Sequence, residues 1–169
     1  TEDEISRLKE ICKQYPFSIK LVELGQNHGV AKGRNKTLEY IETEWVMFLD
    51  NDIYFINNPL VRIQKDLAKL GCHFISLPLL EPDRKTLFAK GGNIYVGYDG
   101  NTIHVGAGSA CKQTIAESFD DDGFLSTFLF GGACVLKKST FQALGGYDSA
   151  MFVGFEDIDF SIRLFQQGY

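Results

Sequence analysis

The sequence predicts a single α/β domain over residues 1–169, in which helices flank a mostly parallel central sheet. Strand and helix patterns alternate along the chain, as they do in layered α/β proteins. The run EWVMFLD at residues 44–50 is almost continuously apolar, which is typical of a strand buried on both faces. With 44% hydrophobic and 23% charged residues, the chain has the composition of one ordinary globular domain with its own core.

The first half of the chain contains the clearest strand and helix patterns. Apolar residues recur at helical spacing before Pro16, and Pro59 is placed at the first turn of a later helix. The elements that we expect here are a helix over 4–15, a strand over 18–24, a helix over 30–41, the strand over 44–50, a helix over 60–70 and a strand over 72–77.

The second half has a higher glycine content and less regular patterns. Tyr98-Asp99-Gly100-Asn101 separates two β-like runs between residues 87 and 105, which predicts a hairpin. Residues 106–126 are rich in Gly, Ser and Asp and indicate a mobile loop. After this loop we expect a strand over 128–136, a helix over 139–144 and an amphipathic helix over 156–167.

Charge and hydropathy exclude several classes of partner. The net charge is -5 and the basic residues form no run, so we expect no nucleic-acid partner. No apolar stretch has the ~20 residues that a transmembrane helix needs, and no signal peptide is visible. We therefore expect a cytoplasmic protein whose contacts with a membrane, if it has any, come from regions outside this chain. The four cysteines lie far apart, which favours buried free thiols over zinc ligands or disulfides.

Asp50-Asn51-Asp52 follows the buried strand over 44–50 and is a candidate metal site. In open α/β sheets ligands bind beyond the carboxyl ends of strands. Two carboxylates two residues apart can both reach one hard cation, such as Mg²⁺ or Mn²⁺, whose other ligands are waters and phosphate oxygens. Asp and Asn also form turns readily, so the triplet by itself fits a simple turn equally well.

Two further patterns have a chemical and a structural interpretation. Glu156, Asp157 and Asp159 open a predicted helix, where carboxylates can serve catalysis or simply interact favourably with the helix dipole. Gly131-Gly132 indicates a backbone that a ligand approaches closely, although a β-bulge uses glycine as readily.

Two long stretches in the expected order resemble family 2 glycosyltransferases with the GT-A fold. "NHGVAKGRNKTLEYIETEWVMFLDND" is similar to the central signature of that family, which ends in an Asp-x-Asp triplet. "FLFGGACVLKKSTFQALGGYDSAMFVGFEDIDFSIRLFQQGY" is similar to its second signature, which contains a Gly-Gly strand and a Glu-Asp pair. Together these stretches cover most of the chain.

The resemblance implies an enzyme that transfers a sugar, with inversion, from a nucleotide-diphosphate sugar to an acceptor hydroxyl. It implies a UDP-linked donor, an Mn²⁺ or Mg²⁺ cofactor, and a glycan, lipid or protein acceptor. Asp157 would act as the catalytic base, with Glu156 sharing that task or orienting the acceptor. Asp52 would bind the metal together with Asp50. The residues that would contact the donor are Asn27, Gly29, Arg34, Asp50, Asn51 and Gly132.

The family pattern also differs from this sequence at both ends. Family members normally begin with an apolar strand and a donor loop and continue past the Glu-Asp helix, so we expect this chain to be a GT-A fragment that is incomplete at both ends. A related nucleotidyltransferase and a non-catalytic binding domain remain open as alternatives. Ile53 and the lack of a later Asp-Asp pair disfavour a phosphatase of the haloacid dehalogenase type. Gly25 to Gly33 has the spacing of neither a P-loop nor a dinucleotide-binding loop.

Overall fold

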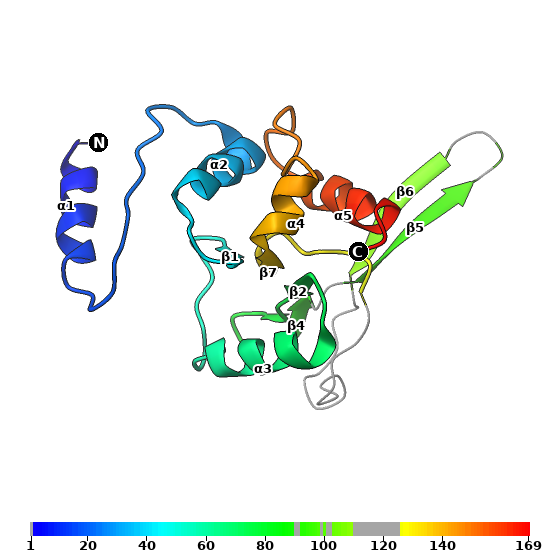
Figure 1. The fold of residues 1–169 in the computed structure, drawn as a ribbon, viewed down its shortest axis with the longest axis horizontal. Coiled ribbons are helices and arrows are strands. Elements are labelled where there is room, and N and C mark those ends of the chain that lie inside the picture. The colour runs from blue at the N-terminus through cyan, green and yellow to red at the C-terminus, as the bar shows by residue number, and fades with distance from the viewer. Residues whose placement is uncertain (1, 90–91, 99, 101–102, 110–125) are drawn as a thin grey trace.

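The computed structural model describes residues 2–89, 92–98, 100, 103–109 and 126–169 (Figure 1). Most of the loop that we expected over 106–126 lies outside the described residues. The helices are α1 (Glu2–Cys12), α2 (Gly29–Thr37), the 3₁₀ helix η1 (Leu38–Tyr40), α3 (Leu60–Leu70), α4 (Lys138–Ala143) and α5 (Glu156–Gln166). The strands are β1 (Trp45–Leu49), β2 (Phe74–Ser76), β3 (Leu79–Leu80), β4 (Leu87–Ala89), β5 (Gly92–Tyr98), β6 (Ile103–Ser109) and β7 (Ala133–Lys137).

The sheet that positions the site has the strand order β1-β7-β2. Both pairings are antiparallel, with Leu49 opposite Ala133 and Ser76 opposite Cys134. The prediction of a mostly parallel sheet is therefore wrong for the strand pairs that the structure describes. Because β1 and β2 are each antiparallel to β7, they run in the same direction, as two strands joined by α3 should. The sequence pattern predicted the unit of β1, α3 and β2. It did not predict that β7, which comes much later in the chain, lies between β1 and β2.

Two antiparallel hairpins lie outside this sheet. β3 pairs with β4, and β5 pairs with β6 with Tyr98 opposite Ile103. The second pair confirms the hairpin that was predicted around Tyr98-Asp99-Gly100-Asn101. In Figure 1 it extends away from the helices as a separate arm.

The core lies between the sheet and the helices α2, α4 and α5. Its centre is a group of buried aromatic rings, with Phe141 packed 5.0 Å from Tyr147 and 4.9 Å from Phe160 between ring centroids. Phe48 of β1 adds an edge-on contact to Phe141 at 5.6 Å. Aromatic pairs at these separations are favourable beyond the area they bury. The core therefore joins the segment around β1 to the far end of the chain.

The N-terminal part of the chain departs most from the prediction. Residues 18–24 have no β-ladder partner among the described residues, so the strand expected there is wrong. Ile19 and Leu21 remain 39% and 40% exposed, because alternation alone cannot form a strand without a neighbour to pair with. α1 has no buried residue and stands apart from the other helices in Figure 1.

Smaller differences concern element ends. The helix expected over 30–41 is α2 followed by η1, and β7 begins at Ala133 rather than at 128. Among the described residues, no helix is long and apolar enough to cross a lipid bilayer.

Candidate active site

Asp50-Asn51-Asp52 forms the turn that follows β1. The Ile53 amide donates a hydrogen bond to the Asp50 carbonyl at 3.2 Å, and all three residues of the triplet are exposed. The Asp50 amide donates to the Gly132 carbonyl at 2.9 Å, which continues the pairing of β1 with β7 by one step. The turn thus leaves the two carboxylates at the surface while its backbone is anchored to Gly132.

Gly131-Gly132 runs between a carboxylate from each half of the chain. The Gly131 amide donates a hydrogen bond to Asp157 Oδ2 at 3.1 Å. A Cβ at Gly131 would lie 3.2 Å from that oxygen, and a Cβ at Gly132 would lie 3.1 Å from Asp50 Oδ2. The close approach that the two glycines predicted is therefore made by the protein's own side chains. This segment brings Asp50 and Asp157 to one place.

Asp157 and Glu156 differ in their exposure although they are adjacent. Asp157 is partly exposed, and its Oδ1 accepts a hydrogen bond from the Ile158 amide at 2.9 Å. Glu156 is only 5% exposed, and its Oε2 has no hydrogen-bond partner among the described residues. Phe155 before them has φ of 66°, a left-handed conformation that costs a non-glycine residue energy and recurs at functional sites. The geometry leaves Asp157 as the more accessible of the two carboxylates.

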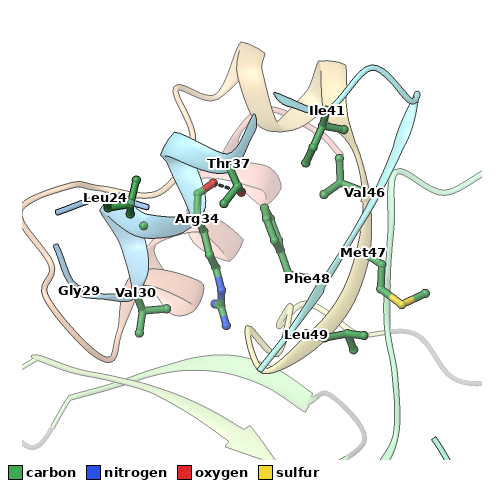
Figure 2. A pocket seen from close by; sticks show the side chains of 11 residues that line it. Leu24, Gly29, Val30, Arg34, Thr37, Ile41, Val46, Met47, Phe48 and Leu49 are labelled. Carbon is green, nitrogen blue, oxygen red and sulfur yellow. Dashed lines mark hydrogen bonds between the residues drawn. The ribbon is translucent and has the colours of Figure 1, made fainter. Parts of the chain in front are cut away.

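Arg34 of α2 contacts carboxylates on both sides of this segment. Its Nη2 lies 2.5 Å from Asp50 Oδ1, and its Nη1 lies 3.5 Å from Glu156 Oε1. The Arg34 side chain extends from α2 alongside Phe48 (Figure 2), and its guanidinium carbon lies 5.7 Å from the centre of that ring. With 12% of its side chain exposed, Arg34 is not the surface arginine that a lone residue on a helix suggests.

Asn27 and Gly29 shape the start of α2. The Asn27 side-chain oxygen accepts a hydrogen bond from the Gly29 amide at 2.9 Å, and Gly29 has φ of 75°. The Val30 amide donates to the Phe152 carbonyl at 2.8 Å. A Cβ at Gly29 would lie 2.1 Å from that carbonyl oxygen, so only glycine fits. These contacts dock the start of α2 onto the loop that precedes Glu156.

Asn35 joins two distant parts of the chain, although the sequence assigned it no role. Its amide nitrogen donates to the Tyr147 carbonyl at 2.7 Å, and its oxygen accepts from the Tyr147 amide at 2.9 Å. The two residues are 112 positions apart, so this pair ties α2 directly to the segment before α5. Asn is a poor helix former, and its presence inside α2 was the available signal for a specific hydrogen-bonding role.

A groove of about 470 Å³ adjoins the site between α2 and β1 (Figure 2). Its lining is apolar except for Thr37 and Arg34, and Arg34 is its charged member. Below the site, burial raises the pKa of the Cys134 thiol to about 12 and raises the pKa of Tyr147 well above its usual value. Both groups are therefore neutral at physiological pH. The three described cysteines are free, but only Cys134 is fully buried.

Most of the charged candidate residues of this site are acidic. Asp50 and Glu156 pair with the guanidinium of Arg34, and Asp50 and Asp52 are exposed in the turn. Within the described ranges, no three His, Cys, Asp or Glu side chains converge where they could hold a metal ion together. The two exposed carboxylates of the turn instead fit a hard cation that keeps several waters and is completed by phosphate oxygens.

Comparison with known protein families agrees with the first of the two signatures. Residues 3–127 match the family described as glycosyl transferase family 2. This match includes Asn27, Arg34 and the Asp50-Asn51-Asp52 turn, whereas Gly132 and the Glu156-Asp157 pair follow it. No curated protein matches the chain. Because the match spans more than half of the residues, the chain belongs to glycosyl transferase family 2.

Proposed function

We propose that this chain forms the catalytic centre of an inverting, metal-dependent glycosyltransferase that uses a UDP-linked sugar and an acceptor hydroxyl. Family membership supports glycosyl transfer in general and implies the GT-A α/β fold. One observation carries the rest of the proposal. Gly131-Gly132 runs between Asp50 and Asp157, so a carboxylate suited to the donor side adjoins one suited to the acceptor side.

The donor side is built around the turn after β1. Asp52 and Asp50 would hold Mn²⁺ or Mg²⁺, which when bound neutralises the charge that develops on the departing diphosphate. Around them, the remaining donor-side residues are Asn27, Gly29, Arg34, Asn51 and Gly132. The exposure of Asp50 and Asp52 supports this role, because a nucleotide diphosphate can reach them without any rearrangement of the core.

On the acceptor side Asp157 is the residue that would remove a proton from the attacking hydroxyl. Both of its oxygens accept backbone hydrogen bonds, from Gly131 and Ile158, which fix the carboxylate while leaving it partly exposed. The acceptor oxygen forms a bond to the anomeric carbon as the bond from that carbon to the diphosphate breaks. The hydroxyl proton passes to Asp157, and the leaving nucleotide carries the electron pair.

Calorimetric titration of the full-length protein with UDP and Mn²⁺ tests the donor side. We expect Mn²⁺-dependent binding of UDP in the wild type and its loss in Asp52→Ala. Asp66→Ala is the matched control, because Asp66 forms an exposed ion pair with Arg62 on α3 and such pairs contribute little. Unchanged binding in Asp52→Ala would refute the metal assignment.

Release of UDP from UDP-sugars tests the acceptor side. Asp157→Asn should keep the wild-type affinity for UDP and Mn²⁺ but lose roughly 10²- to 10⁴-fold in turnover, the range that general base catalysis contributes. If the wild type bound neither UDP nor Mn²⁺, the non-catalytic alternative would be favoured instead.

A further inference from the structure

The two ion pairs of Arg34 share one guanidinium between opposite sides of the site. Nη2 faces Asp50 at 2.5 Å, and Nη1 faces Glu156 at 3.5 Å. The guanidinium is planar and carries its charge delocalised over its nitrogens. A negative group at Nη1 therefore lowers the positive charge that Nη2 presents to Asp50.

Glu156 is buried beneath the site and does not lie at its surface. The residue is 5% exposed, whereas Asp157 beside it is partly exposed. A carboxylate this deeply buried is stable only with a charge partner or hydrogen bonds. Among the described residues, Arg34 is the partner that its carboxylate faces.

Arg34 also competes with any cation at the turn. Asp50 accepts a short charge-assisted hydrogen bond from Arg34 through Oδ1, so the guanidinium charge also faces any metal ion that the same carboxylate holds. The strength of that competition depends on how much positive charge Arg34 directs at Asp50. The negative charge of Glu156 offsets part of the positive charge of Arg34 and so weakens this competition.

We propose that Glu156 is a positioning residue that acts through Arg34 and keeps Asp50 available to a divalent cation. This inference rests on the proposed function and refines it. Glu156 then supports cation binding on the donor side through Arg34 and does not remove the proton from the acceptor. Asp157 is left as the sole base. The donor-side role proposed for Arg34 is refined in the same way: Arg34 acts through Asp50 and Glu156 and does not itself contact the nucleotide, since most of its side chain is covered.

The test measures the affinity of the full-length protein for UDP and Mn²⁺ by calorimetry in three variants. In Glu156→Gln, Arg34 directs its full charge at Asp50, so the affinity should fall about 10- to 100-fold, as expected for a strengthened charge-assisted bond. In Arg34→Gln/Glu156→Gln the competing cation is absent, and the affinity should return to near the wild-type value. Asp159→Asn is the matched control. Asp159 lies in the same helical turn as Glu156, but its carboxylate pairs with Arg163 instead of Arg34.

Thermal unfolding of each variant shows whether the fold is retained. The double variant replaces a buried ion pair by two neutral groups, a change that proteins often tolerate well. Recovery of affinity in the double variant supports the inference, because a merely structural role for Glu156 predicts that the second substitution adds to the damage.

Two other results would overturn it. Wild-type affinity in Glu156→Gln would show that Glu156 does not act on the donor side, while the proposed function would stand. Affinity that stays low in the double variant would show that Arg34 is not the competitor. Absence of UDP and Mn²⁺ binding in the wild type would instead refute the proposed function itself, and the inference with it.

Discussion

Gly29→Ala is the substitution that most directly tests how the site is assembled. Gly29 is the first residue of α2 and has φ of 75°, and a Cβ there would lie 2.1 Å from the carbonyl oxygen of Phe152. The clash is with backbone, so no side chain can move aside to relieve it. We expect α2 and the loop before Glu156 to separate.

The expected loss follows from two contributions. Placing an L-residue in the left-handed region costs about 1–2 kcal/mol. Displacing the Phe152 carbonyl breaks its 2.8 Å hydrogen bond from Val30, which is worth about 1 kcal/mol. The free energy of unfolding should therefore fall by about 2–3 kcal/mol. For a domain of this size that lowers Tm by about 4–12 °C.

Gly33→Ala is the matched control in the same helix. A Cβ at Gly33 meets nothing within 4 Å, and the residue lies inside α2 with ordinary helical geometry. Alanine is favoured over glycine in a helix interior by about 1 kcal/mol, so this variant should be slightly stabilised. Urea unfolding followed by circular dichroism compares the two variants. Equal stability of Gly29→Ala and Gly33→Ala would refute the contact between α2 and the Phe152 loop.

Four more outcomes are expected, at Asn35, Cys134 and Gly132. Asn35→Ala removes two hydrogen bonds to the Tyr147 backbone and leaves partly buried groups unpaired, so urea unfolding should show a loss of about 2–4 kcal/mol. Cys134 should resist iodoacetamide at pH 8.5 in the folded protein, as mass spectrometry can show, because its thiol is buried with a pKa of about 12. The contribution of this raised pKa to stability is fully present below the ordinary thiol value of 9.0 and is lost as pH rises from 9 to 12, by at most about 1.4 kcal/mol per pH unit. Cys134→Ala should lack this contribution and should keep only the fall above pH 10 that the raised pKa of Tyr147 causes. Gly132→Ala should weaken the binding of UDP and Mn²⁺ measured by calorimetry, because its Cβ would meet Phe130 at 2.8 Å and Asp50 Oδ2 at 3.1 Å.

Local patterns predicted the elements whose signals lie within the element itself. Helix α3 has the predicted bounds, because its apolar spacing and Pro59 are signals within the helix itself. The strand after residue 44 was equally clear, but the expectation that both of its faces are buried is wrong. Val46 and Phe48 are buried against the core, whereas Leu49 is 39% exposed. The expected strand over 18–24 failed for the opposite reason. A strand needs a neighbour, and the pattern of one segment does not reveal whether that neighbour is present.

The candidate site residues come from the sequence, whereas their arrangement comes from the structure. The two signatures identified Asp50 and Asp157 as candidates whose roles stay predictions, and the two glycines between them indicated close approach by a ligand. The burial of Glu156 was not predictable, because Glu156 and Asp157 occupy the same kind of position at the start of a helix. Only the packing of α5 against the core decides which of the two carboxylates faces inward.

The position of β7 in the sheet has a consequence for synthesis of the protein. β7 is the middle strand, and both of its partners precede it in the sequence. A ribosome adding 5–20 residues per second needs several seconds to proceed from β2 to β7. During that time the nascent chain exposes two apolar strands with unpaired edges, which is the condition under which chains aggregate. Chaperone dependence during translation is therefore expected to end once β7 has left the exit tunnel.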